Sequence, residues 1–166
     1  MFINRILRAL NPAWVRWEGN NVVRLVPCGG RTSLVERMPA ELRACGERGG
    51  DTTLIVWADL DHDMADGEAL KRVFWQACQA QGIERELFDR AVFVFAKDRL
   101  ENWIEYLNTG ATDEGREGPR VSPREAADAA RTLAERCRRG APEPQMPPSL
   151  KWSCQNWREL TLRMRG

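Results

Sequence analysis

Histidine, paired cysteines and long apolar runs are scarce in this sequence. Its only histidine is His62, and none of its five cysteines has a partner at zinc-ligand spacing, so a zinc site is not expected. Five is an odd number, which argues against a disulfide framework and favours reduced thiols in the cytoplasm. No apolar run approaches the length of a membrane span, and residues 1–10 are too short and too interrupted by arginine for a secretory signal. These absences predict a soluble, cytoplasmic protein that does not enter a membrane.

An excess of charge of one sign is also missing. The 25 basic residues nearly balance the 24 acidic ones, and the net charge is +1. The whole chain therefore has no strong attraction for nucleic acid or an anionic membrane, and such binding would need a local patch. No internal repeat or coiled-coil heptad is visible. With 166 residues, we expect a single domain over residues 1–166, with a core at about 21–114 and C-terminal helices at about 123–162.

Apolar runs that alternate with helical patterns indicate an α/β fold. The predicted strands and the helices that follow them occupy residues 22–26, 33–46, 53–58, 67–81, 91–95 and 100–107. The run at 53–58 is almost continuously apolar, as expected for a central strand that is covered on both faces. This alternation predicts a parallel sheet with right-handed crossovers, in which ligands gather beyond the carboxyl ends of the strands.

Several residues predict where helices begin and end. Ser33 and Glu36 have the spacing of a capping box, while Pro39 disfavours one continuous helix after them. Ser122 and Pro123 are typical of the start of a helix. The remaining expected segments are a short amphipathic turn at 3–10, helices at 123–138 and 149–162, and a proline-rich linker at 142–148.

Three acidic residues directly follow the middle apolar run: Asp59, Asp61 and Asp63. Two carboxylates two residues apart at a strand end can point to the same side and share a divalent cation through their oxygens. At the open edge of a sheet, such a cation can keep water ligands and accept a phosphate group. Aspartate is also common in solvated turns after strands, so the spacing alone leaves metal binding and a plain turn open.

Two other features have a functional and a structural interpretation. Gly29, Gly30 and Arg31 could hold an anion at the start of a helix, but an ordinary turn between strand and helix is the more common use of such residues. Trp152 and Trp157 lie among basic residues in the last predicted helix. They could contact a partner or nucleic acid, or they could dock this helix on the sheet.

Three segments, taken in order, carry a resemblance to a known family. They are residues 26–32 (VPCGGRT), 56–61 (VWADLD) and 93–104 (FVFAKDRLENWI). They resemble TOPRIM-like proteins, the fold shared by topoisomerases, primases and OLD-family nucleases, and most closely the small bacterial stand-alone members. In that family a first strand ends in Glu-Gly, a second in Asp-x-Asp, and a third is followed by a segment similar to Asn-Ile-Glu-Thr-Trp. The similarity spans about residues 22–114, with a weaker match at 147–157.

The resemblance implies a parallel-sheet, TOPRIM-like (Rossmann-like) domain flanked by helices, with a C-terminal helical extension. It implies Mg²⁺ or Mn²⁺ held by Asp59 and Asp61, which match the Asp-x-Asp pair. Asp63 would assist, and Glu101 matches the glutamate before tryptophan. In such enzymes the metal polarises a phosphoryl oxygen and generates the attacking hydroxide.

The resemblance also implies a phosphate site and exposes one departure from the family. Lys97, Arg99 and Arg31 would hold phosphate oxygens. The family's first-strand glutamate, the expected acid or base, falls on Cys28 or Gly29 here. The candidate to replace it is Glu36, which completes the predicted catalytic set with Asp59, Asp61 and Glu101.

By resemblance, we expect a divalent-metal-dependent nuclease, or a related phosphodiester-processing domain, that acts on DNA or RNA in DNA maintenance or phage defence. The alternative is a catalytically inactive subunit that binds a separately encoded ATPase. The missing first-strand glutamate favours the inactive subunit, whereas the retained Asp59, Asp61 and Glu101 favour the enzyme. The sequence is compatible with a homo-oligomer but does not determine the oligomeric state.

Overall fold

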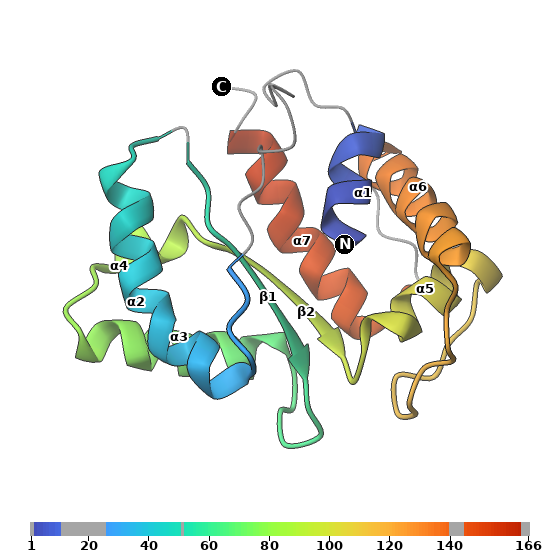
Figure 1. Cartoon of the computed structure of the whole chain (residues 1–166), viewed down its shortest axis with the longest axis horizontal. Helices are drawn as coiled ribbons and strands as arrows, with labels where there is room; N and C mark the ends of the chain where they lie inside the picture. The colour runs from blue at the N-terminus through green and yellow to red at the C-terminus, as the bar shows by residue number, and fades with distance from the viewer. Residues whose placement is uncertain (1, 11–25, 51, 140–144, 164–166) are drawn as a thin grey trace.

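The computed structural model describes residues 2–10, 26–50, 52–139 and 145–163 as a mixed α/β fold in which helices surround a parallel pair of strands (Figure 1). In chain order the elements are α1 (Phe2–Leu10), α2 (Arg31–Glu47), β1 (Ile55–Leu60), α3 (Gly67–Ala80), α4 (Arg85–Asp89), β2 (Val92–Lys97), α5 (Leu100–Thr109), α6 (Pro123–Arg139) and α7 (Pro148–Arg163). No helix in the described part of the chain is both long and apolar enough to cross a lipid bilayer.

The two strands pair in parallel along their whole length. The register begins with Ile55 opposite Val92 and ends with Leu60 opposite Lys97. Helices α3 and α4 form the crossover between the strands, because parallel neighbours cannot be joined by a tight turn. The carboxyl ends of β1 and β2 therefore lie side by side, and the segments that follow them share one edge of the sheet.

Both faces of the sheet are apolar and covered by helices. Successive side chains of a strand point to opposite faces, so each strand supplies both cores. On one face, Val56 and Phe93 belong to a cluster packed against α2, α3 and α4. On the other face, Trp57 and Val94 contact a cluster built with α1, α5, α6 and α7. Figure 1 shows these two groups of helices on opposite sides of the strands.

Helix α7 closes the edge of β2 that faces away from β1. The Ser153 hydroxyl accepts a hydrogen bond from the Phe95 N–H at 3.0 Å and donates one to the Phe95 carbonyl at 3.1 Å. One helical turn earlier, the Ser149 hydroxyl accepts a hydrogen bond from the Lys97 N–H at 3.1 Å. Serines four residues apart share one face of a helix, so α7 presents both hydroxyls to β2 where another strand would otherwise pair.

The predicted elements are largely present with shifted bounds. The strands predicted at 53–58 and 91–95 appear as β1 and β2, and each ends two residues later than predicted. β1 continues because Leu60 is buried and pairs with Lys97, so the strand does not stop at the first aspartate. The longer predicted helices correspond to α2, α3, α5, α6 and α7, with bounds that differ by at most two residues, whereas α4 was not predicted.

The predicted first strand lies mostly outside the described residues. Residues 22–25 are not described, and Val26 is not part of a strand. Within the described residues the sheet therefore has two strands, and its strand order is β1-β2. The short turn expected at residues 3–10 is a complete helix, α1.

The start of α2 differs from the prediction. The capping box expected at Ser33 and Glu36 is wrong, because α2 already begins at Arg31 and both residues lie inside it. Its N-cap is Gly30, which has no side chain, and the preceding Gly29 has a φ of 74°, a left-handed value that glycine adopts readily. Pro39, expected to interrupt the helix, is instead buried within a continuous α2.

A capping box is present at the start of α6. The Glu125 N–H donates to the Ser122 hydroxyl at 3.2 Å, and the Ser122 N–H donates to the Glu125 carboxylate at 2.7 Å. These bonds satisfy backbone donors that a helix start leaves free. The predicted start of this helix at Ser122 and Pro123 is therefore confirmed.

The C-terminal helices are part of the core rather than an appended extension. Ala129 and Leu133 of α6 share an apolar cluster with Ile3 and Ile6 of α1. Leu150 of α7 is fully buried in the same cluster. Of the proline-rich segment expected at 142–148, residues 142–144 lie outside the described residues, and the buried Met146 and Pro147 lead directly into α7.

Candidate functional site

The acidic residues after β1 and the charged residues after β2 meet at the carboxyl edge of the sheet. The Asp98 N–H donates to the Leu60 carbonyl at 3.0 Å, which extends the pairing of the strands by one bond. The segments 59–63 and 97–101 therefore lie next to each other. This is the arrangement that the strand-helix-strand pattern predicts for a parallel sheet.

Asp59 lies at this edge, on the side of the sheet that carries α5. The alternation along β1 places it with Ile55 and Trp57, and its side chain is exposed. Partial desolvation by the surrounding protein raises the pKa of Asp59 most, and repulsion from Glu101 and Asp61 adds to this shift. Attraction to Arg99 opposes it. Glu101, Asp61 and Arg99 therefore lie within electrostatic range of Asp59.

Arg31, the first residue of α2, binds the other two aspartates of the loop. Its guanidinium donates to both carboxylate oxygens of Asp63, at 2.8 and 2.6 Å, and lies 3.2 Å from a carboxylate oxygen of Asp61. The hydrogen bond from Arg31 lowers the pKa of Asp63, and the same bond raises the pKa of Arg31. Asp61 and Asp63 are therefore held towards α2, whereas Asp59 is not bound by Arg31.

The two other predicted phosphate ligands also have partners within the protein. The Lys97 ammonium donates to the carbonyls of Asp61, at 3.3 Å, and Met64, at 3.0 Å. These bonds tie the loop after β1 to the end of β2. Arg99 forms an ion pair of 2.5 Å with Glu117. The structure thus brings Arg31, Lys97 and Arg99 to the acidic edge, each with an intramolecular partner.

Glu101 is positioned by the start of α5, whose geometry depends on its neighbour Asn102. Asn102 is almost completely buried, and its amide donates to the carbonyls of Lys97, at 3.3 Å, and Arg116, at 3.0 Å. A Cβ atom added at Gly118 would lie 2.8 Å from the Asn102 backbone nitrogen. The loop between α5 and α6 therefore packs closely over the first turn of α5 and fixes the place of Glu101.

Glu36 is exposed and lies on α2, five residues after Arg31. Cys28, one of the two residues on which the family's first-strand glutamate was predicted to fall, is half-buried, and its thiol donates to the Val26 carbonyl at 3.4 Å. That Glu36 replaces the family's glutamate stays a prediction.

Sequence reasoning missed one residue at this edge, Asp98. Its backbone has a φ of 57°, a value that few residues other than glycine adopt, and its side chain is only 10% exposed. One carboxylate oxygen lies 3.6 Å from Nδ1 of His62, and the other is buried without a partner among the described residues. In the sequence, only its position shortly after a predicted strand could have indicated that Asp98 belongs to this site. Between Lys97 and Arg99, it looks like an ordinary surface charge.

A second missed feature lies beneath the site. The Ser149 hydroxyl accepts a hydrogen bond from the Trp103 indole N–H at 2.7 Å and donates one to the Glu114 carboxylate. The Ser149 N–H donates to the same carboxylate at 3.3 Å. Trp103 is therefore a buried packing residue, and the segment from Glu114 is bound to the start of α7.

The acidic residues at the carboxyl edge of the sheet have the negative charge that a metal ion requires, but their side chains are not spaced to hold one. In the described part of the chain, no three side chains of histidine, cysteine, aspartate or glutamate are grouped so that they could hold a metal ion. Desolvation by the surrounding protein, with a smaller contribution from repulsion by Glu101 and Asp61, nevertheless raises the pKa of Asp59 and disfavours its ionised form. A divalent cation relieves such repulsion, and oxygen ligands of this kind suit Mg²⁺ and Mn²⁺.

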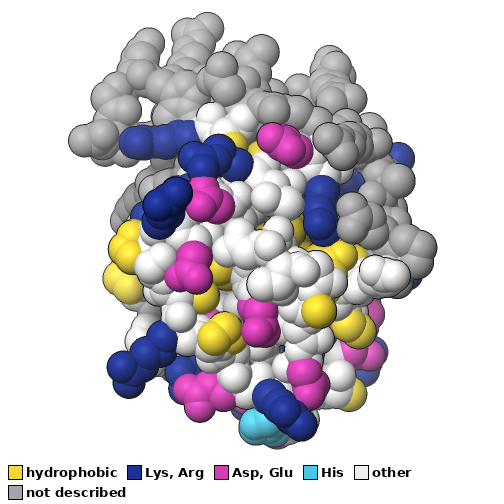
Figure 2. Space-filling view, turned by 90° about the vertical axis from the view of Figure 1, so that its right-hand side faces the viewer, with side chains coloured by type: hydrophobic (Ala, Val, Ile, Leu, Met, Phe, Trp, Pro, Cys, Tyr) yellow, Lys and Arg dark blue, Asp and Glu magenta, His cyan; other side chains and the backbone are white. Residues whose placement is uncertain are grey.

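Among the described residues on the face drawn in Figure 2, acidic and basic side chains are mixed, and they form no large basic patch. This matches the balanced composition of 25 basic and 24 acidic residues. Any attraction for a polyanion on this face would have to come from a few positioned cations, since a broad positive field is lacking.

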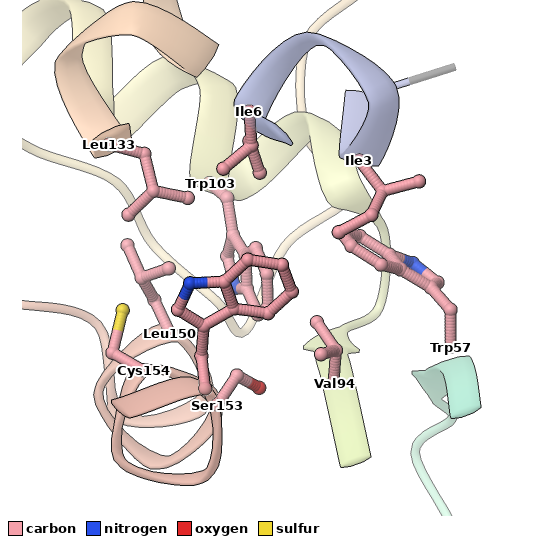
Figure 3. Close-up of a pocket in the computed structure, with 10 residues that line it drawn as sticks. Ile3, Ile6, Trp57, Val94, Trp103, Leu133, Leu150, Ser153 and Cys154 are labelled. Carbon is pink, nitrogen blue, oxygen red and sulfur yellow. The ribbon is translucent and has the colours of Figure 1, made fainter. Parts of the chain in front are cut away.

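An apolar pocket lies on the α1 side of the sheet (Figure 3). Its walls come from both strands and from α1, α5, α6 and α7, and they consist of Ile3, Ile6, Trp57, Val94, Trp103, Leu133, Leu150, Ser153, Cys154 and Trp157. None of these side chains carries a charge at neutral pH. The Cys154 thiol is the one titratable group in this lining, which contains no carboxylate, so the pocket is not part of the acidic edge.

Comparison of the chain with protein-family models, curated proteins and solved structures finds no match.

Proposed function

We propose that the protein is a divalent-metal-dependent nuclease whose active centre is the carboxyl edge of the sheet. The observation that supports this most is the raised pKa of Asp59, which arises from desolvation and from the nearby Glu101 and Asp61. A carboxylate whose ionised form is disfavoured by desolvation and by neighbouring carboxylates gains free energy when a cation binds it. The TOPRIM-like order of the sequence motifs assigns this edge to phosphodiester chemistry.

Four acidic residues at this edge would bind the cation. Asp59 and Asp61 would be its main ligands, with Glu101, from the first turn of α5, and Asp63, from the loop, as further ligands. A bound Mg²⁺ or Mn²⁺ supplies Lewis acidity towards a phosphoryl oxygen and lowers the pKa of a bound water. The buried Asn102, which anchors the start of α5, orients Glu101 for this role.

The basic residues of the edge bind the nucleic acid backbone. Arg31 presents a planar guanidinium that matches a phosphate group with two parallel hydrogen bonds. Arg99 lies close enough to Asp59 to influence its pKa, so a phosphate bound there is next to the carboxylates. Lys97 contributes charge at the same place while its ammonium holds the loop. No base-specific contact is part of this proposal, and DNA and RNA are both candidate substrates.

The test is the loss of cleavage when the main ligands are removed. We expect the double variant Asp59→Asn, Asp61→Asn to lose Mn²⁺-dependent cleavage of DNA and RNA by about 100-fold or more, because loss of metal contacts costs at least this much. The matched control is Glu86→Gln, which neutralises an exposed carboxylate of α4 near the opposite end of β2. Cleavage that survives in the double variant would show that the acidic edge is not the active centre.

A second candidate function is a catalytically inactive subunit that binds a separate ATPase. Two observations favour it: the glutamate of the TOPRIM-like pattern falls on Cys28 or Gly29, and Arg31 already pairs with Asp61 and Asp63. This function predicts no cleavage with any divalent cation and a stable complex with the ATPase.

A further inference from the structure

One side chain in the wall of the apolar pocket has a hydrogen-bond donor without a partner. Trp157 of α7 lines the pocket and is only 7% exposed, and its indole N–H has no hydrogen-bond partner in the described part of the chain. We propose that this pocket is a binding site for a small neutral molecule, whose apolar body fills the pocket and whose acceptor oxygen bonds to the Trp157 N–H. The inference does not depend on the proposed nuclease, because none of the residues that line the pocket belongs to the acidic edge.

The lining of the pocket selects for a neutral and largely apolar ligand. Ile3 and Ile6 of α1, Val94 of β2 and Leu133 of α6 point into it (Figure 3). None of the residues that line the pocket carries a carboxylate or a basic group. Moving an ion from water into such surroundings without a partner charge is unfavourable. The walls therefore disfavour phosphates, carboxylates and metal ions, and they reward the burial of apolar surface.

The Trp157 N–H differs from two other donors in the lining, which already have acceptors. The Trp103 N–H donates to the Ser149 hydroxyl at 2.7 Å, and the Ser153 hydroxyl donates to the Phe95 carbonyl at 3.1 Å. A buried donor without an acceptor is unfavourable, and such groups are rare in folded proteins. The Trp157 nitrogen is closed to solvent, so the indole has to turn slightly when a ligand enters. The hydrogen bond to the ligand favours this shift, because it exists only in the bound state.

The size of the pocket limits the ligand to a slim group. The cavity volume is about 30 Å³. One water molecule needs about 10–15 Å³ on this scale, whereas an apolar cavity that binds benzene measures about 150 Å³. The ligand is therefore a short aliphatic ketone, aldehyde or alcohol, or the end of a longer chain that carries such a group.

The test is an NMR titration of the full chain with two probes. One is butanone, and the other is its hydrocarbon analogue, in which a methylene group replaces the carbonyl oxygen. We expect butanone to bind saturably with a Kd of about 1–10 mM, as suits a molecule of this size, and to move the Trp157 indole proton downfield. The hydrocarbon should bind without this downfield shift. Butanone that does not bind saturably, or that leaves the indole proton in place, would overturn the proposal.

Trp157→Phe removes the N–H and keeps an aromatic ring in the wall. We expect this variant to bind butanone about fivefold more weakly than the wild type, because it loses one hydrogen bond. Its affinity for the hydrocarbon should stay within about twofold. Equal changes in the two affinities would show that the indole N–H does not contact the ligand. If the variant does not fold, as judged by thermal unfolding, the comparison of the two probes on the wild type decides.

A second pair of variants tests the location of the site. Cys154→Leu places a larger side chain in the wall of the pocket and should weaken the binding of both probes by about tenfold or more. Cys28→Leu is the matched control, since Cys28 is also half-buried but does not line the pocket, and it should bind both probes as the wild type does. Cys154→Val replaces the first variant if that one does not fold. Unchanged binding in the variant of Cys154 would place the ligand elsewhere and contradict the proposal.

Discussion

At the scale of single residues, Asp59 and Asp63 show how position decides the behaviour of chemically identical side chains. Desolvation and neighbouring carboxylates raise the pKa of Asp59, whereas Arg31 lowers the pKa of Asp63. A raised pKa means that the folded protein disfavours the ionised carboxylate, and a lowered pKa means that it favours it. Ionised Asp59 therefore destabilises the fold at neutral pH, and ionised Asp63 stabilises it.

We predict opposite effects of neutralising these two residues. At neutral pH, Asp59→Asn should raise the unfolding temperature slightly, and Asp63→Asn should lower it slightly. The penalty of Asp59 develops as the pH rises from its unfolded pKa through its higher folded pKa. The contribution of Asp63 is present above its unfolded pKa and is lost as the pH falls through its lower folded value.

The measurement is thermal unfolding of both variants and the wild type over a range of pH. Both differences should shrink as the pH falls below about 3.9, the ordinary pKa of aspartate. The difference for Asp63 should persist to lower pH, because its folded pKa is lowered. Shifts of the same sign at neutral pH, or shifts that do not depend on pH, would contradict the assignment of these two environments.

At the scale of elements, α7 takes a role that usually belongs to a strand. Ser153 satisfies both the N–H and the carbonyl of Phe95, and Ser149 satisfies the N–H of Lys97. Phe95 and Ser153 are both buried, so water does not replace these bonds if they are lost. The position of α7 is therefore specified by polar contacts with β2 as well as by apolar packing.

We predict that Ser153→Ala destabilises the protein by about 1–3 kcal/mol, because it leaves a buried backbone N–H and carbonyl unsatisfied. The control is Ser33→Ala, which removes an exposed hydroxyl within α2 and should change the stability by no more than about 0.5 kcal/mol. Urea unfolding of the three proteins measures both values. A Ser153→Ala variant as stable as the wild type would show that α7 is held by apolar packing alone.

At the scale of the whole molecule, two apolar cores on opposite faces of the sheet are joined at α7. Leu150 and Trp157 of α7 belong to the cluster with α1, whereas Trp152 packs against the cluster with α2 and α3. The Trp152 ring stacks on Phe95 at 5.2 Å and covers Gly67, where an added Cβ atom would lie 2.5 Å from the indole. The contact between α3 and α7 thus requires glycine at position 67.

We predict that Gly67→Ala destabilises the protein by about 1–3 kcal/mol, the usual cost of forcing an extra methyl group into a packed contact. Gly50→Ala is the matched control, since a Cβ atom at that position would meet no neighbour, and its effect should stay within about 0.5 kcal/mol. Thermal unfolding followed by tryptophan fluorescence measures both. Equal stability of the two variants would mean that Trp152 moves aside at no cost.

Much of the fold could be predicted from the sequence, because β-branched and aromatic runs and helical spacing report local preferences directly. The run at 91–95 and the Ser122-Pro123 start of α6 are examples of such local signals. The start of α2 was misplaced because Ser33 and Glu36 fit a capping pattern that the preceding glycines make unnecessary. The role of α7 at β2 could not be predicted, since it depends on hydrogen bonds between residues more than fifty positions apart.

For the candidate site, the sequence could predict the location but not the pairings. The alternation of predicted strands and helices was sufficient to place Asp59, Asp61 and Glu101 near the carboxyl edge of the sheet, because neighbouring parallel strands end at the same edge. The engagement of Asp61 by Arg31 depends on how α2 packs, which no local pattern encodes. The buried carboxylate of Asp98 escaped notice for the same reason: its burial is created by the surrounding segments and not by its neighbours in sequence.

The serine hydroxyls of α7 also determine at which edge this sheet can gain a strand. Intermolecular assembly by strand addition needs a row of free peptide groups along an outer strand. On β2, the N–H and carbonyl of Phe95 and the N–H of Lys97 are already bonded to α7, so an added strand would have to displace the helix. In the sheet that the structure describes, recruitment of a further strand, from this chain or from another molecule, is therefore directed to the side of β1.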